Sequence, residues 1–173
     1  MLKTILPEQT IPQSYYDCRY FILREPLGFP RGAEILADDD QAIHSYFAKG
    51  DKVLAVGRAH VIPLGSDGSA ADHAGPDATK CPGFSPLSQQ DDNRPAIQIR
   101  QMGTLTSERR KGLAALVLSN LEGASKKQYG AKFGFLQARE HAIPFYQSQG
   151  WEIIDTPYTI EGIGPHRSMM KQL

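Results

Sequence analysis

A strand-to-helix junction in the middle of the sequence constrains the fold of this chain more than any other feature. Residues 95–105 form an apolar run, partly β-branched, that predicts a strand. Residues 110–129 then repeat leucine, valine and alanine at helical spacing, and Gly130 is a typical residue for ending a helix. A strand that leads directly into an amphipathic helix predicts a sheet with helices packed against it.

The same two patterns continue through the rest of the chain. Lys49-Gly50-Asp51 is typical of a hairpin turn between two strands. A length of 173 residues suits one domain, residues 1–173, built as a mixed α/β structure around one twisted sheet. The other predicted strands are residues 2–6, 43–48, 52–62, 132–137, 151–155 and 167–172, and the other predicted helices are residues 15–24 and 140–148.

One long segment lacks either pattern. Residues 65–94 are dominated by Gly, Ser, Asp, Pro and Ala without periodicity. A loop of that length inside a small domain is either functional or mobile. We expect residues 65–94 to be a flexible loop inserted between two strands.

Charge and composition exclude several classes of partner. The chain has 19 basic and 19 acidic residues, so a formal net charge of zero gives no case for nucleic acid or a membrane surface. No apolar run approaches a membrane span, and residues 1–7 lack the features of a signal peptide. Two widely separated cysteines, Cys18 and Cys81, fit a cytoplasmic protein with free thiols.

The turn of the central junction has the composition of a phosphate site. Arg109-Arg110-Lys111-Gly112 places three cations and a glycine where the helix begins. Unpaired main-chain N–H groups and the positive end of the helix dipole converge at such a point, and glycine lets a ligand approach the backbone. The alternative is a solvated basic turn that only caps the helix.

Three motifs resemble one enzyme family. Arg109-x-x-Gly112-x-Ala114 is similar to the pyrophosphate loop R/Q-x-x-G-x-G/A of the GCN5-related N-acetyltransferase (GNAT) superfamily. The segment 142–146, AIPFY, followed by Gly150-Trp151, resembles the A-x-x-F-Y…G-F/Y/W segment of that family. Residues 162–171 are similar to the closing strand G-I-P-H-x-x-M-x-K of an uncharacterised bacterial branch, with one extra glycine. The fold that this resemblance implies is a mostly antiparallel twisted sheet of six or seven strands flanked by about four helices.

The resemblance implies acyl transfer from acetyl-CoA to a primary amine of a small molecule or peptide. The pyrophosphate would bind the loop, and the pantetheine arm would lie along residues 102–104. Between that strand and the strand ending near Gln137, a splayed pair would expose main-chain groups, and an N–H near Thr104 would face the thioester oxygen. The residues implied for cofactor binding are Met102, Gly103, Thr104, Arg109, Arg110, Lys111, Gly112, Leu113, Ala114, Arg139 and Tyr146.

The general acid has one candidate residue, whereas the general base has several. Tyr146 is the candidate general acid, because a phenol stays protonated at neutral pH and can donate to a thiolate. Glu140, His166 and Glu25 are candidates for the general base, with His166 favoured because the closing strand ends beside the acceptor site. His141 is less favoured, since we expect it to face solvent. For each of these residues a structural or surface role is the alternative.

Acceptor recognition is assigned to the first helix and the loop after it. Arg24 and Glu25 are the candidate acceptor-binding residues, and Arg24 or Arg31 could recognise an acidic acceptor. Arg139 stands where many relatives have asparagine, so it could bind phosphate, pair with Glu140 or orient the loop.

Other functions remain open at this point. A non-catalytic protein that binds or senses acyl-CoA would keep the loop without turnover. We expect no metal, because the spacing of Asp72, His73, Asp77 and Cys81 matches no zinc pattern. A homodimer is possible, since dimers are common in the family.

Overall fold

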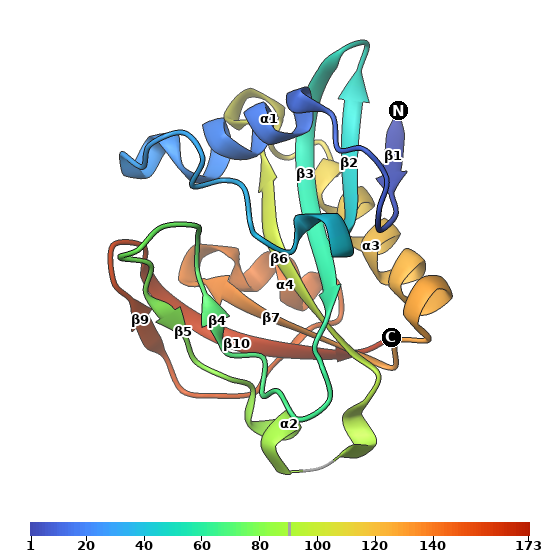
Figure 1. The fold of residues 1–173 in the computed structure, drawn as a ribbon, viewed down its shortest axis with the longest axis vertical. Coiled ribbons are helices and arrows are strands. Elements are labelled where there is room, and N and C mark those ends of the chain that lie inside the picture. The colour runs from blue at the N-terminus through green and yellow to red at the C-terminus, as the bar shows by residue number, and fades with distance from the viewer. Residues whose placement is uncertain (90) are drawn as a thin grey trace.

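The computed structural model describes residues 1–89 and 91–173. Its described residues form an eight-stranded, mostly antiparallel sheet together with a separate two-stranded ribbon (Figure 1). The strands of the large sheet are β1 (Leu2–Ile5), β2 (Ile43–Lys49), β3 (Lys52–Val61), β6 (Ala96–Thr104), β7 (Phe133–Arg139), β8 (Glu152–Ile153), β9 (Tyr158–Ile160) and β10 (Gly164–Gln172).

The strand order is β1-β2-β3-β6-β7-β10-β8, with β9 paired to β10. The β6–β7 pair is parallel, and the other pairs of this sheet are antiparallel. The predicted mixed, mostly antiparallel fold is therefore confirmed. Strand β9 was not predicted, because its three residues are too few to show alternation.

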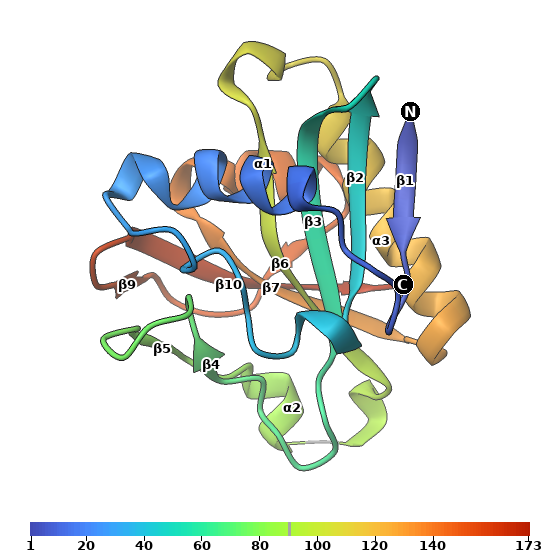
Figure 2. The same cartoon turned by 45° about the horizontal axis from the view of Figure 1, so that its top comes forward.

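Helices cover both faces of the sheet. The four α-helices of the described residues are α1 (Gln13–Leu23), α2 (Ser85–Gln89), α3 (Leu113–Tyr129) and α4 (Ile143–Ser148). Helix α1 crosses one face over β3 and β6, while α3 and α4 lie on the opposite face (Figures 1 and 2). Apolar side chains fill both layers: Trp151 and Leu121 are buried on the α3 side, and Tyr15 and Val56 are buried on the α1 side.

Helix α1 is attached to the sheet by buried charges as well as apolar contacts. Arg19 of α1 and Arg58 of β3 both contact the Asp39 carboxylate, at 3.1 and 2.7 Å. His44 of β2 bonds to the Tyr15 hydroxyl at 3.0 Å and to the Asp39 carbonyl at 2.7 Å. Burial lowers the pKa of His44 to about 4, so this imidazole is neutral at pH 7. The network fixes α1 over the middle of the sheet.

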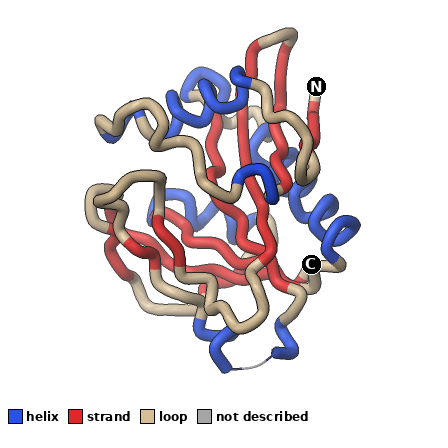
Figure 3. The backbone as a smooth tube through the Cα atoms, viewed as in Figure 1, coloured by secondary structure: helices blue, strands red, loops and turns tan. Residues whose placement is uncertain are grey.

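Segment 65–94 has more structure than its sequence suggested. Its described residues include strands β4 (Ala70–Ala71) and β5 (Lys80–Cys81), helix α2 and the 3-10 turn Asp91–Asn93; residue 90 lies outside the described residues. Phe84 is buried against Phe135 of β7, with ring centroids 5.1 Å apart. Figure 3 shows this long connection between β3 and β6, with two short strands in it. The flexibility of the segment stays a prediction.

Strands β6 and β7 separate after a short paired stretch. Their register runs from Ala96 opposite Phe133 to Gln98 opposite Phe135 and ends there, although both strands continue. The predicted splayed strand pair is thereby confirmed. The separation leaves one edge of β6 without a strand partner in the middle of the sheet.

A β-bulge bends β6 at the same place. Val56 of β3 pairs with Gly103 and Arg58 pairs with Arg100, so Gln101 and Met102 together face the single residue Gly57. Gln101 has a φ of 55°, which a bulge can require of a non-glycine residue. A Cβ on Gly57 would lie 2.3 Å from the Met102 sulfur, so glycine is needed opposite the bulge.

Candidate active site

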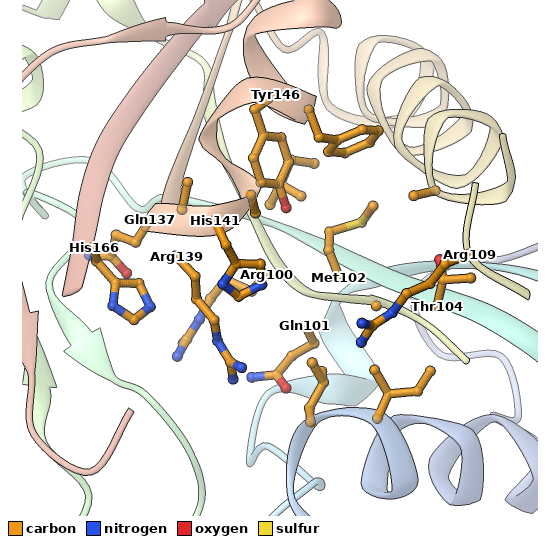
Figure 4. Close-up of a pocket in the computed structure, with 18 of the residues that line it drawn as sticks. Arg100, Gln101, Met102, Thr104, Arg109, Gln137, Arg139, His141, Tyr146 and His166 are labelled. Atoms are coloured by element: carbon orange, nitrogen blue, oxygen red, sulfur yellow. The ribbon is translucent and has the colours of Figure 1, made fainter. Parts of the chain in front are cut away.

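The separated strands open into a cavity of about 620 Å³. It lies between the end of α1, the bulged part of β6, the start of α3, and α4, and side chains from all of these point into it (Figure 4). Its lining residues are Ile22, Leu23, Arg24, Asp72, Ile99, Arg100, Gln101, Met102, Gly103, Thr104, Arg109, Arg110, Ala114, Gln137, Ala138, Arg139, His141, Ala142, Phe145, Tyr146 and His166.

One end of the cavity is the loop before α3. Gly112 is the N-cap of α3 with a φ of 76°, and Arg110 has a φ of 62°. The first main-chain N–H groups of α3 have no partner within the helix. Among the described residues, no atom beyond the neighbouring backbone lies within 4 Å of where a Cβ of Gly112 would stand, so this backbone has open space beside it. Arg109, Arg110 and Ala114 line this end of the cavity.

Outside the lining lie three loop residues, Lys111, Gly112 and Leu113. Lys111 forms an ion pair with Glu108 at 2.9 Å, and its side chain is 57% exposed. Leu113 is buried in the core between the sheet and α3. We therefore assign neither side chain to ligand contact, and only their main-chain atoms belong to the loop.

The bulged part of β6 forms the floor. Met102, Gly103 and Thr104 all line the cavity. The Thr104 hydroxyl is buried and has no hydrogen-bond partner among the described residues, so a ligand could satisfy it. Gly103 has a packing reason for being glycine, because a Cβ there would lie 2.5 Å from the Ile22 side chain of α1.

Tyr146 stands on α4 with its hydroxyl directed into the cavity (Figure 4). The rest of its ring is packed against Phe145 and Trp151, at centroid distances of 5.0 and 6.3 Å. Burial raises the pKa of Tyr146 above its ordinary value. The phenol is therefore protonated at neutral pH and held in a single position.

His166 stands on β10 opposite Arg139 of β7, at the other end of the cavity from Arg109 (Figure 4). Its Nδ1 lies 2.7 Å from the Gly164 carbonyl, which can only accept, so Nδ1 carries the proton and Nε2 has a free lone pair. Burial lowers the pKa of His166. A neutral imidazole with a free Nε2 can accept a proton.

The structure places three of the candidate residues differently from the prediction. Glu140 and Glu25 are exposed and do not line the cavity, which corrects their assignment as base or acceptor ligand. Both follow a residue that points inward: Arg139 ends β7 and Arg24 caps α1, so the next side chain in each case turns away from the cavity. His141 is exposed as expected, yet it does line the cavity.

Arg31 and Asp72 also differ from expectation. Arg31 lies outside the lining, where it pairs with Asp17 at 2.7 Å and lies over the Tyr20 ring. Asp72 of segment 65–94 lines the cavity and was missed as a site residue. No local signal marks Asp72, because its place depends on how the segment folds back over the sheet.

The described residues hold no group of three or more His, Cys, Asp or Glu side chains suited to a metal ion. Within the same residues, no helix has both the length and the apolar character needed to cross a membrane.

The family model for the acetyltransferase (GNAT) domain matches residues 80–173, more than half of the chain. The chain belongs to the GNAT acetyltransferase family. The match includes the loop before α3, Tyr146 and His166, and thus most of the cavity of this GNAT domain.

Solved structures share the GNAT fold over nearly the full chain. A candidate N-acetyltransferase from Lactobacillus plantarum superposes with a TM-score of 0.68 at 20% identity, over 99% of this chain and 98% of that one. Escherichia coli ElaA superposes with a TM-score of 0.66 at 16% identity, over 99% of this chain and 100% of that one. Arabidopsis thaliana NAA60 in complex with acetyl-CoA superposes with a TM-score of 0.66 at 12% identity, over 100% of this chain and 99% of that one. At these identities the likeness concerns the fold alone. No curated protein sequence gives a significant match.

Proposed function

We propose that the protein is an N-acetyltransferase that moves an acetyl group from acetyl-CoA to a primary amine while both are bound. The observation that carries the proposal is the convergence of two separate motifs on one cavity. The loop 109–114 and Tyr146 are far apart in sequence, yet residues of both line it. The structures of NAA60 with acetyl-CoA and of an aminoglycoside 6'-N-acetyltransferase with coenzyme A, which share this fold, support the choice of donor.

The residues present fit coenzyme A. Open backbone at Gly112, the start of α3 and the guanidinium groups of Arg109 and Arg110 suit a diphosphate. The unpaired edge of β6 suits the amide groups of the pantetheine arm, which can bond like a neighbouring strand. The bound thioester would supply an acetyl group activated for attack.

The side chains at the middle of the cavity can then move the protons. His166 Nε2 would take a proton from the acceptor ammonium, directly or through water. The free amine would attack the thioester carbonyl, forming the C–N bond, while main-chain N–H groups on the edge of β6 stabilise the oxygen. The C–S bond would then break, the thiolate would take the proton of the Tyr146 hydroxyl, and the attacking nitrogen would release its second proton to water, which leaves a neutral amide. Both side chains would return to their starting states by exchange with water.

Tyr146→Phe tests this assignment most directly. Release of free thiol from acetyl-CoA is measured across an amine library. Loss of the acid should lower turnover by roughly 100-fold or more. Coenzyme A affinity, measured by calorimetry, should stay unchanged because the ring remains in place.

Tyr129→Phe is the matched control, since the Tyr129 hydroxyl bonds to the Gln41 carbonyl far from the cavity. Equal turnover of Tyr146→Phe and the wild type would remove Tyr146 from the mechanism. Coenzyme A binding without thiol release for any amine would instead favour the non-catalytic acyl-CoA sensor.

A further inference from the structure

The end of the cavity away from α3 carries an excess of positive charge. Arg24, Arg100 and Arg139 line it, and Asp72 is the one acidic residue in the described lining. This charge is separate from Arg109 and Arg110, which lie at the loop end. Unpaired charge inside a protein is costly, so each of these guanidinium groups needs a partner in the protein, in solvent or in a bound group.

Arg24 and Arg100 are already engaged. Arg24 donates to the Ala33 carbonyl at 3.2 Å, to the Asp72 carboxylate at 3.4 Å and to the Gln101 amide oxygen at 3.0 Å. Arg100 donates to the Asp72 carbonyl at 2.9 Å. Burial lowers the pKa of Arg24 to about 10, which still leaves it charged at pH 7. These two arginines hold segment 65–94 against the cavity.

Arg139 is different. Among the described residues, no hydrogen bond or ion pair holds its guanidinium, and the sequence-based pairing with Glu140 is not formed. Its side chain extends into the open cavity between His166 and Gln101 (Figure 4). Burial raises the pKa of Tyr146 and lowers that of His166; the charge of Arg139 partly offsets the first shift and adds to the second, so Arg139 lies within electrostatic reach of both. The guanidinium of Arg139 therefore lies in the cavity beside His166, the proposed base (Figure 4).

We propose that the acceptor is an amine that also carries a carboxylate, and that Arg139 binds this carboxylate. This inference rests on the proposed function and names its substrate class. A guanidinium presents two parallel N–H groups that match the two oxygens of a carboxylate. One free guanidinium matches one negative charge, which favours a carboxylate over a doubly charged phosphate. The remaining positive charge of this end disfavours polyamines and other cationic acceptors.

Matched pairs of acceptors test the proposal. Each amino acid is compared with its carboxamide, and kcat/KM is measured by thiol release from acetyl-CoA. The wild type should prefer the acid by about 10- to 100-fold, the range for a hydrogen bond between charged groups. Arg139→Gln, which keeps donors but removes the charge, should lose most of that preference and leave the carboxamides nearly unchanged. Arg31→Gln, a change at an arginine outside the cavity, should keep the preference.

A binding measurement keeps this test independent of turnover. Calorimetry of the acid and its carboxamide against the protein saturated with coenzyme A should show the same preference and the same loss in Arg139→Gln. If no amine is acetylated but the acid still binds better, the proposed function fails and the acceptor site stands.

Three results would overturn the inference. The first is equal use and equal binding of acids and carboxamides by the wild type. The second is a preference for an aminoalkyl phosphate over the matching amino acid, which would assign the site to phosphate. The third is a loss of coenzyme A affinity in Arg139→Gln with the acid preference retained, which would place Arg139 in the cofactor site.

Discussion

The two ends of the cavity are built in opposite ways. The end at the start of α3 comes from one short stretch of chain, residues 102–114, and combines backbone groups with the guanidinium groups of Arg109 and Arg110. The opposite end combines side chains from the end of α1, segment 65–94, β6, β7 and β10. A backbone site can tolerate varied side chains, whereas a site of converging side chains depends on each of them. The proposed donor site should therefore be robust, and the proposed acceptor site selective.

The largest expected effect is at the acceptor end. His166→Gln should lower kcat by roughly 100- to 1,000-fold, because it removes the proposed base. Since burial lowers the pKa of His166 below the ordinary value of histidine, its neutral form dominates at neutral pH. The kcat/KM of the wild type should fall as the pH drops through this lowered pKa, and His166→Gln should lose that limb. The affinity for coenzyme A should not fall over the same pH range.

His141→Gln decides between the two histidines of the cavity. A pH limb that is lost in His141→Gln but kept in His166→Gln would transfer the role of base to His141.

The next largest effect is at the donor end. Gly112→Glu places a carboxylate beside the proposed diphosphate, where two negative charges about 5 Å apart repel by about 3 kcal/mol at an effective dielectric constant of 20. Coenzyme A affinity by calorimetry should fall more than 100-fold. Gly123→Glu is the control, since Gly123 is an exposed residue of α3 with no neighbour within 4 Å of its Cβ position. Equal affinity of the two variants would contradict the loop assignment.

A smaller effect concerns the contact between Gly103 of β6 and Ile22 of α1, which both line the cavity. Gly103→Ala would force Ile22 of α1 away from β6 and should lower the free energy of unfolding by about 1 to 3 kcal/mol. Gly123→Ala, at an exposed position in the middle of α3, should raise the free energy of unfolding by up to about 1 kcal/mol. Thermal or urea unfolding measures both. A neutral Gly103→Ala variant would show that α1 can move away from the cavity.

The smallest expected effect has an unusual direction. Asp72→Asn removes the one negative charge of the described lining, which is half-buried and 3.4 Å from Arg24. An amino acid acceptor should then bind up to about five-fold more tightly, because a partly exposed charge contributes at most about 1 kcal/mol. Its KM should fall and coenzyme A affinity should stay unchanged. A higher KM would indicate that Asp72 binds the acceptor ammonium.

The sequence was most informative where structure is local. The strand, turn and helix of residues 95–129 were predicted within a few residues, and the turn before Gly112 lies at the cavity as expected. Gly130 ends α3 with a φ of 63°, as its position suggested. These features depend on neighbouring residues, and so their sequence pattern is sufficient.

Prediction was weaker where residues meet across the fold. Asp72 reaches the cavity only because Arg24 and Arg100 hold it there, and nothing in its own segment indicates that contact. Glu25 and Glu140 lie outside the cavity for the complementary reason: each is one position after an inward-facing arginine, and each begins a 3-10 turn that directs its side chain elsewhere. The spacing of a motif therefore identifies which segment lies at the site, but it does not determine which side chains of that segment point into the cavity.

Segment 65–94 departs from β3 and returns to β6, two strands that are already paired with each other. Its exposed turns can therefore change without moving either strand or the loop before α3, whereas Phe84 and Leu87 pack in the core against Phe135 of β7. Relatives could exchange one proposed acceptor for another by changing these turns, while the loop before α3, the proposed donor site, stays the same. Grafting the segment between homologues is thus a route to redesigning selectivity.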